Sequence, residues 1–176
     1  MRFLLNILFL IISLFTLSTS DSFSHGPTRQ KVKISVTIKA KPEDVWNVIK
    51  DFEKINNWHP SISKVESDGK IRTIFYSPRN NTPITQKLES HSNEKMMYKT
   101  SISEVDIKFF PVNTYTANIS VKGNDDGSST VLWKAAFYRA FLNNDPPPEL
   151  NEAAAIKAVT EFFEAGLNNL KSKLEK

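Results

Sequence analysis

The side chains best suited to acid–base chemistry in this chain are its three histidines, because histidine titrates close to neutral pH. His59 stands between Trp58 and Pro60, where the mouth of a cavity could lie, whereas His25 and His91 stand far from it in the sequence. A general base at His59 needs an orienting carboxylate and a substrate proton within hydrogen-bond reach. The sequence shows neither, so we expect a loop histidine that is held by packing.

Other catalytic and cofactor chemistry has no matching pattern. The chain has no cysteine, and the spacing of its histidines is not that of metal ligands. Its five glycines stand at positions 26, 69, 123, 127 and 166, so neither a nucleophile elbow nor a glycine-rich phosphate loop is present. We therefore predict no catalytic residue, no metal site and no cofactor, and a protein that is not an enzyme.

The elements that must position any site begin with a strand and a helix. From Lys31 to Lys39 every even position is apolar and every odd position is Lys, Ser or Thr, which predicts a strand with one buried face. Pro42 then opens a helix at a tolerated first-turn position, and Val45, Trp46, Ile49 and Phe52 recur at helical spacing. A second short helix or turn is expected over residues 53–60.

Strands joined by short turns are predicted next, at residues 62–66, 71–76, 84–90, 95–103, 112–122 and 129–141. Such a meander forms an antiparallel sheet. In residues 112–122 strict alternation places Val112 and Tyr115 on opposite faces.

A long amphipathic helix closes the chain. From Glu149 to Lys176 the large apolar residues recur at steps of three and four, which predicts one buried stripe: Ile156, Val159, Phe163, Leu167, Leu170 and Leu174. Gly166 interrupts this helix and is expected to mark a tight crossing over the sheet. Pro146, Pro147 and Pro148 cannot lie inside a helix and form a rigid link before it.

The order of strand, PEDVWNVIKDFEKINNWHP, meander and terminal helix resembles the helix-grip domains of the START and polyketide-cyclase-like superfamily, also called SRPBCC. Pro42, Val45-Trp46, Asp51-Phe52 and Trp58-His59-Pro60 carry the likeness, together with Phe110-Pro111-Val112, Tyr115 and Val131-Leu132-Trp133. The resemblance implies an α+β helix-grip fold, in which a curved antiparallel sheet of about six or seven strands wraps around the C-terminal helix, with two short helices after the first strand.

Such a fold can enclose a cavity, and several side chains are candidates for its lining. They are Trp58, His59, Tyr98, Tyr115, Trp133, Phe137, Arg139, Phe163 and Leu167. The same residue types line solid cores and ligand pockets, so both alternatives stay open. Arg139 could bind an anionic group at the cavity mouth or extend outward into solvent.

A narrower resemblance rests on the segments 133–139 and 143–151, which are similar to the periplasmic MxaD-type proteins of bacterial methanol oxidation. It implies a non-enzymatic accessory protein that assists a quinoprotein dehydrogenase and its cytochrome c, with Pro146, Pro147 and Pro148 as docking candidates. The alternatives are a carrier or sensor of a hydrophobic small molecule and a cyclase- or hydrolase-like enzyme.

The N-terminus predicts export. Arg2 precedes an apolar run over residues 3–17, which is short for a bilayer span of about 20 residues, and small polar residues follow it. We expect a signal peptide at 1–20, a flexible lead-in at 21–30, one domain at 31–176, and a periplasmic or secreted protein with no membrane span after cleavage. The net charge is +4 without blocks of like charge, so no nucleic-acid partner is expected.

Overall fold

The structure, a computed structural model, describes residues 26–176 and consists of one curved antiparallel sheet with a long helix packed along it. The seven strands lie in the order β1-β7-β6-β5-β4-β3-β2, which confirms the predicted antiparallel meander. Their bounds are β1 (Gln30–Ile38), β2 (Ile62–Ser67), β3 (Ile71–Tyr76), β4 (Thr82–Ser92), β5 (Met97–Val105), β6 (Val112–Gly123) and β7 (Ser129–Arg139). The predicted signal peptide and residues 21–25 of the lead-in lie outside the described residues.

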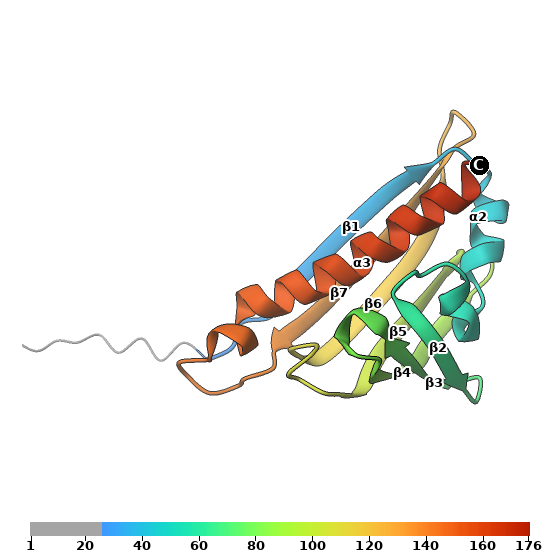
Figure 1. The fold of residues 1–176 in the computed structure, drawn as a ribbon. Coiled ribbons are helices and arrows are strands. Elements are labelled where there is room, and N and C mark those ends of the chain that lie inside the picture. Colours follow the sequence, from blue (N-terminus) through green and yellow to red (C-terminus); the bar gives the residue numbers. More distant parts are fainter. Residues whose placement is uncertain (1–25) are drawn as a thin grey trace, which may run out of the picture.

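The helices occupy one face and one end of the sheet (Figure 1). The long helix α3 (Glu152–Leu174) runs beside β1 and β7, while α2 (Pro42–Ile49) and the 3₁₀ helix η1 (Phe52–Asn57) lie near the C-terminal end of α3. Two further 3₁₀ turns are η2 (Ser77–Arg79) and η3 (Pro148–Leu150). This arrangement is the helix-grip fold that the resemblance implied. Within residues 26–176 no helix has the length and apolar character needed to cross a bilayer.

Local sequence accounts for where the first helices begin. Pro42 occupies the first turn of α2, where its missing N–H costs no hydrogen bond. The Asp51 carboxylate accepts a hydrogen bond from the Glu53 backbone N–H and so caps η1. The apolar side chains of α2 and η1 face the core, and three of them are completely buried: Val45, Ile49 and Ile55.

The buried face of α3 contains four of the six predicted residues, Val159, Phe163, Leu167 and Leu170, but not Ile156. Ile156 is 36% exposed, whereas Phe162, which the expected stripe omitted, is buried. The helix turns its small residues Ala155, Ala158 and Gly166 inward, because they let the helix backbone approach the sheet closely. The predicted burial of Ile156 was therefore wrong.

Gly166 marks the closest approach, as predicted. A Cβ atom built on Gly166 would lie 2.6 Å from His59 Cδ2 and 3.1 Å from Trp133 Cζ3. Both neighbours are rings held on several sides, so neither can move aside easily. The glycine therefore sets the distance between α3, the residues that follow η1, and β7.

A bulge in β6 overturns the face predicted for Val112, while the predicted alternation holds from Tyr115 to Val121. Asn113 pairs with Tyr138 and Thr116 with Ala136, so β6 has one more residue than β7 in this interval. Thr114 takes up the extra length with a positive φ of 48°, which is rare for a β-branched residue. As a result Val112 and Tyr115 are both buried, instead of lying on opposite faces.

We expect Gly166→Ala to destabilise the fold by about 1–3 kcal/mol, the usual range for overpacking, even though alanine favours helices. Urea unfolding of the two proteins measures the change. Asn168→Ala, on the exposed side of α3, is the matched control and should leave stability unchanged or slightly raised. A stabilised Gly166→Ala protein would contradict the tight crossing.

Candidate functional site

The part of the interior that faces the middle of α3 is filled by rings. Trp133 stacks on Phe163 with centroids 4.2 Å apart, and Phe162 lies 4.3 Å from the His59 ring. Trp58 packs against Trp133 at 5.5 Å. These aromatic residues form a solid core between the helix and the sheet.

His59 is held inside this aromatic core by both ring nitrogens. Nε2 lies 2.8 Å from the Phe162 carbonyl oxygen, and Nδ1 accepts a hydrogen bond from the Ser61 backbone N–H at 3.3 Å. This pattern assigns the ring proton to Nε2. Burial lowers the pKa of His59 to about 4, so the ring is neutral near neutral pH.

A polar cluster occupies the other part of the interior, around Arg72 of β3. Arg72 is 1% exposed and donates from Nε and Nη2 to Gln86 Oε1, at 2.9 and 2.7 Å, and from Nη1 to the Phe52 carbonyl. Its guanidinium also lies over the Phe52 ring, 4.2 Å from the centroid. Among residues 26–176 no buried side chain is a carboxylate, so this cation has no buried counter-ion.

An unpaired buried charge is energetically unfavourable. Removing an ion from water costs several kcal/mol in a real protein unless a partner charge compensates it. Burial accordingly lowers the pKa of Arg72, although an arginine stays protonated in proteins. Such a charge, without a buried counter-ion, is a place where an anion would be stabilised.

Two buried polar atoms next to the aromatic core and the Arg72 cluster make no hydrogen bond, namely Tyr98 Oη and Trp58 Nε1. Burial raises the pKa of Tyr98, and the nearby Arg72 charge opposes that rise. Burial also raises the pKa of Tyr115, and the Arg72 charge again opposes part of that rise. Arg72 and the two tyrosines are thus within electrostatic reach of one another, and unpaired buried groups of this kind are rare in native proteins.

A cleft opens at the surface between β5 and β6. Their pairing ends at Ser101 and Thr116. Beyond that point the two strands pair only with β4 and β7 respectively, and a cleft of about 330 Å³ lies between them. The buried residues Val112 and Tyr115 are among its lining, and Tyr115 also stacks on Phe137 inside the fold.

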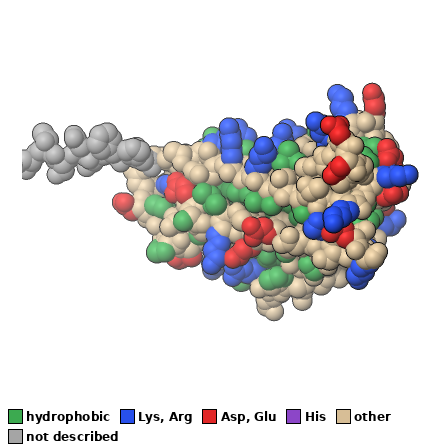
Figure 2. Space-filling model, turned by 90° about the horizontal axis from the view of Figure 1, so that it is seen from above, with side chains coloured by type: hydrophobic (Ala, Val, Ile, Leu, Met, Phe, Trp, Pro, Cys, Tyr) green, Lys and Arg blue, Asp and Glu red, His purple; other side chains and the backbone are tan. Residues whose placement is uncertain are grey.

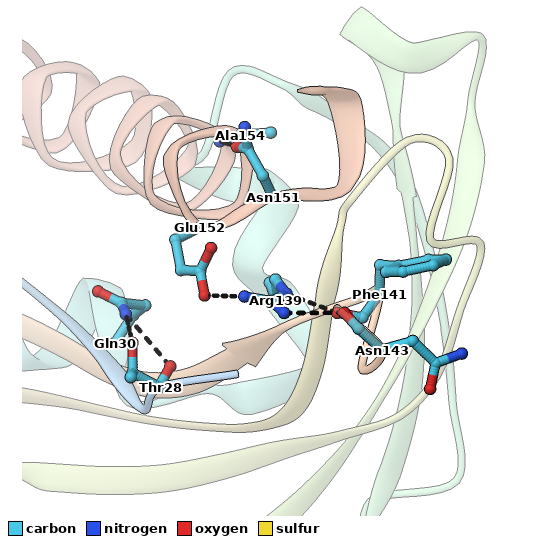
Figure 3. Close-up of polar contacts among 8 residues, drawn as sticks. All are labelled: Thr28, Gln30, Arg139, Phe141, Asn143, Asn151, Glu152 and Ala154. Atoms are coloured by element: carbon cyan, nitrogen blue, oxygen red, sulfur yellow. Dashed lines mark hydrogen bonds and ion pairs between the residues drawn. The ribbon is translucent and has the colours of Figure 1, made fainter. Parts of the chain in front are cut away.

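Arg139 forms a second, separate polar site at the end of β7 (Figure 3). It donates from Nε to the Phe141 carbonyl at 2.7 Å and from Nη2 to the Asn143 carbonyl at 2.9 Å, and Nη1 pairs with Glu152. Burial alone would raise the pKa of Glu152, but a backbone hydrogen bond and the Arg139 guanidinium outweigh it and lower that pKa. The Asn151 side chain caps α3 by accepting from the Ala154 N–H at 2.9 Å.

We call residues 140–151 the β7–α3 loop. The contacts of Arg139 hold the first part of this loop, and its prolines restrict the second part. Pro146 and Pro147 are half-buried, Pro148 is exposed, and Leu142 is 51% exposed. The loop is therefore an ordered surface element.

The outward face of the sheet carries a basic groove of about 510 Å³, which we define by Lys31, Lys33, Lys99 and Lys134. Lys33 and Lys134 stand directly opposite each other on β1 and β7, an unfavourable pairing of like charges. Within residues 26–176 none of the four forms an ion pair. Figure 2 shows basic side chains along one long edge of the molecule, and mixed charges at the end that carries α2.

The structure brings most of the predicted lining residues into the interior. Eight of the nine are buried together in one core: Trp58, His59, Tyr98, Tyr115, Trp133, Phe137, Phe163 and Leu167. Arg139 is also buried, but it points neither into the interior nor into solvent, because it is bound within the β7–α3 loop. Arg72 was missed, although it alternates in phase with Ile74 and Tyr76. Within residues 26–176 no group of three or more side chains could hold a metal ion.

Fold and sequence comparisons agree on the class of protein. A sheet that grips a C-terminal helix is also found in a START superfamily protein from Mycobacterium smegmatis, with a TM-score of 0.63, 14% identity, and coverage of 82% of this chain and 97% of that chain. Residues 29–175 match the family model described as polyketide cyclase / dehydrase and lipid transport. This chain belongs to that family.

Two solved structures are more similar in sequence. The protein XoxI from Bacillus cereus is 26% identical, with a TM-score of 0.70 and coverage of 82% of this chain and 94% of that chain. An uncharacterised protein from Bacillus thuringiensis is 25% identical, with a TM-score of 0.71 and coverage of 84% and 100%. No curated protein sequence matches this chain.

We expect His59 to make stability depend on pH between 6.5 and about 4. In this window the unfolded chain binds a proton at this histidine and the folded chain does not, so the free energy of unfolding falls as the pH falls. The slope is about 1.4 kcal/mol per pH unit for one group. His59→Gln keeps a donor and an acceptor without the titration, and its profile should be flatter than that of the wild type.

Urea unfolding at several pH values measures both profiles, and their difference isolates His59 from the carboxylates that also titrate. His91→Gln is the matched control, because His91 is an exposed residue outside the aromatic core. Parallel wild-type and His59→Gln profiles would show that protonation of His59 does not oppose folding.

Proposed function

We propose that this protein is a non-enzymatic binding protein that holds a small molecule in the polar part of its interior. The helix-grip fold and the family to which the chain belongs support a ligand-binding or accessory role. Fold alone does not determine function, so the proposal rests on the interior itself.

The observation that carries the proposal is the buried hydroxyl of Tyr98, near Arg72, whose Oη makes no hydrogen bond. A buried donor without a partner loses its hydrogen bonds to water and gains nothing in return, at a cost of about 1–3 kcal/mol. A bound molecule that accepts this hydrogen bond removes the cost. The Tyr98 hydroxyl would then help to fix its orientation.

The cleft between β5 and β6 supports the proposal because it gives a small molecule a route to Tyr115. The bulge and the positive φ of Thr114 maintain this separation of the strands. Strained residues and bulges of this kind occur often beside functional sites.

The geometry of His59 favours a protein that binds its ligand without converting it. Both ring nitrogens of His59 are engaged in internal hydrogen bonds. Burial also lowers its pKa to about 4, well below the range that suits a general base near neutral pH.

Native mass spectrometry of the purified protein tests the proposal. We expect the wild type to retain a small molecule. Ser103→Trp places a bulky ring in the cleft and should reduce ligand uptake by at least about tenfold, a change of about 1.4 kcal/mol. Ser77→Trp, exposed and outside the cleft lining, should bind like the wild type. A protein that retains no ligand and takes up none would contradict the proposal.

A second candidate is an accessory role in which the β7–α3 loop docks on a partner. The MxaD-type resemblance of residues 133–139 and 143–151 implies that the partners are a periplasmic quinoprotein methanol dehydrogenase and its cytochrome c. Two observations favour this candidate: Arg139 and the prolines order the loop before any contact, which lowers the entropic cost of docking, and the basic groove complements an acidic partner surface. The likeness to XoxI is compatible with it. The export on which it depends is predicted from residues 1–20, outside the described range.

Replacement of Pro146, Pro147 and Pro148 by Gly-Ser-Gly should weaken docking by about tenfold, because the flexible loop must be ordered on binding. Surface-binding measurements with a quinoprotein dehydrogenase and its cytochrome c measure the effect. Pro78→Ser, in η2, is the control for loss of a proline elsewhere. Equal affinity of the wild type and the Gly-Ser-Gly variant would exclude the loop as the docking element.

A further inference from the structure

We propose that the small molecule is an organic acid whose single carboxylate pairs with Arg72. This inference rests on the proposed function and names the chemical class of its ligand. It follows from the charge of the interior, the free donors of Arg72 and the groups around them.

The two buried arginines differ in one respect. Arg139 pairs with the carboxylate of Glu152, and its other contacts are carbonyl oxygens. Arg72 has carbonyl-type acceptors only, from Gln86 and Phe52. No buried side chain in residues 26–176 is an Asp or Glu, so these residues give Arg72 no buried counter-ion, and a bound anion would supply one.

Arg72 has donors left for such an anion. A guanidinium carries five N–H groups. Two of them, on Nε and Nη2, are directed at Gln86 Oε1, and one on Nη1 is directed at the Phe52 carbonyl. One N–H on each terminal nitrogen therefore has no carbonyl acceptor, and the Tyr98 side chain interacts with the guanidinium beside them. A carboxylate has two oxygens that can accept from such a pair.

The neighbouring hydroxyl fits the same ligand. Tyr98 Oη is buried, unpartnered, and near enough to Arg72 for each group to alter the pKa of the other. Its O–H can donate a third hydrogen bond to a carboxylate oxygen. Tyr115, within the electrostatic reach of Arg72, lines the cleft.

The charge balance indicates one negative charge rather than two. Arg72 is the only buried cation of this cluster, since His59 is neutral near neutral pH and Arg139 is paired with Glu152. A dianion such as a phosphate monoester would leave one buried charge without compensation. The rings of Phe52, Tyr115 and Phe137 and the small cleft favour a compact, apolar body.

The test compares two probes with the same body, phenylacetate and phenylacetamide, which differ in the negative charge. Isothermal titration with the full chain measures both dissociation constants. We expect phenylacetate to bind at least about tenfold more tightly than the amide to the wild type. Arg72→Met should weaken phenylacetate by at least about tenfold and leave the amide unchanged. Arg79→Met, an exposed arginine of η2 between β3 and β4, should behave like the wild type.

Circular dichroism and thermal unfolding show whether each variant is folded. Because Arg72→Met leaves the Gln86 amide without its donor, the double variant Arg72→Met/Gln86→Leu removes the charge together with its main acceptor. It should show the same loss for phenylacetate, so the test does not depend on the single variant being stable.

Equal affinity of the acid and the amide, unchanged binding of phenylacetate to the folded Arg72 variants, or binding of neither probe would each overturn the inference. A neutral molecule retained by both the wild type and Arg72→Met in native mass spectrometry overturns the inference alone and leaves the proposed function standing. No retained molecule together with no probe binding overturns both.

Discussion

The contact of α3 with the residues that follow η1 fixes how far the helix stands from the sheet. At Gly166 the helix has no Cβ, and the His59 ring occupies that space with its Nε2 2.8 Å from the Phe162 carbonyl. Asn169 adds a hydrogen bond to the Trp58 carbonyl at 2.9 Å on the next turn. Since Trp133 stacks on Phe163 beside this contact, the helix, the residues after η1 and β7 form one rigid unit.

This rigid unit divides the interior into two parts with different physics. On the side of α3, rings pack closely on rings, and the histidine among them is neutral with both nitrogens hydrogen-bonded. On the side of β3 to β6, Arg72 carries a charge with no buried counter-ion. The bulge of β6 lies where β5 and β6 part, and the cleft between them is lined by Tyr115, which is within electrostatic reach of Arg72.

The two buried arginines show how the same side chain serves two purposes. Arg139 pairs with a carboxylate and donates to two carbonyl oxygens, and these contacts order a short loop. Its charge and its hydrogen bonds are therefore compensated within the chain. Arg72 has a charge that the chain does not compensate. A structural role explains the first arginine completely, whereas the second is explained when a ligand supplies the missing charge.

The sequence by itself determined the kind and order of the elements, because periods of two and of three to four residues follow directly from strand and helix geometry. It also located the tight crossing at Gly166 and the rigid link at Pro146 to Pro148. Only the tertiary structure decided which side chains are buried and which groups they contact. The bulge moved Val112 to the face of Tyr115. The small residues of α3 turned Ile156 outward. The burial of Arg72 could have been predicted from the sequence, because Arg72 alternates in phase with Ile74 and Tyr76. Its lack of a buried counter-ion could not be predicted, because charges far apart in sequence meet only when the sheet curves around the helix.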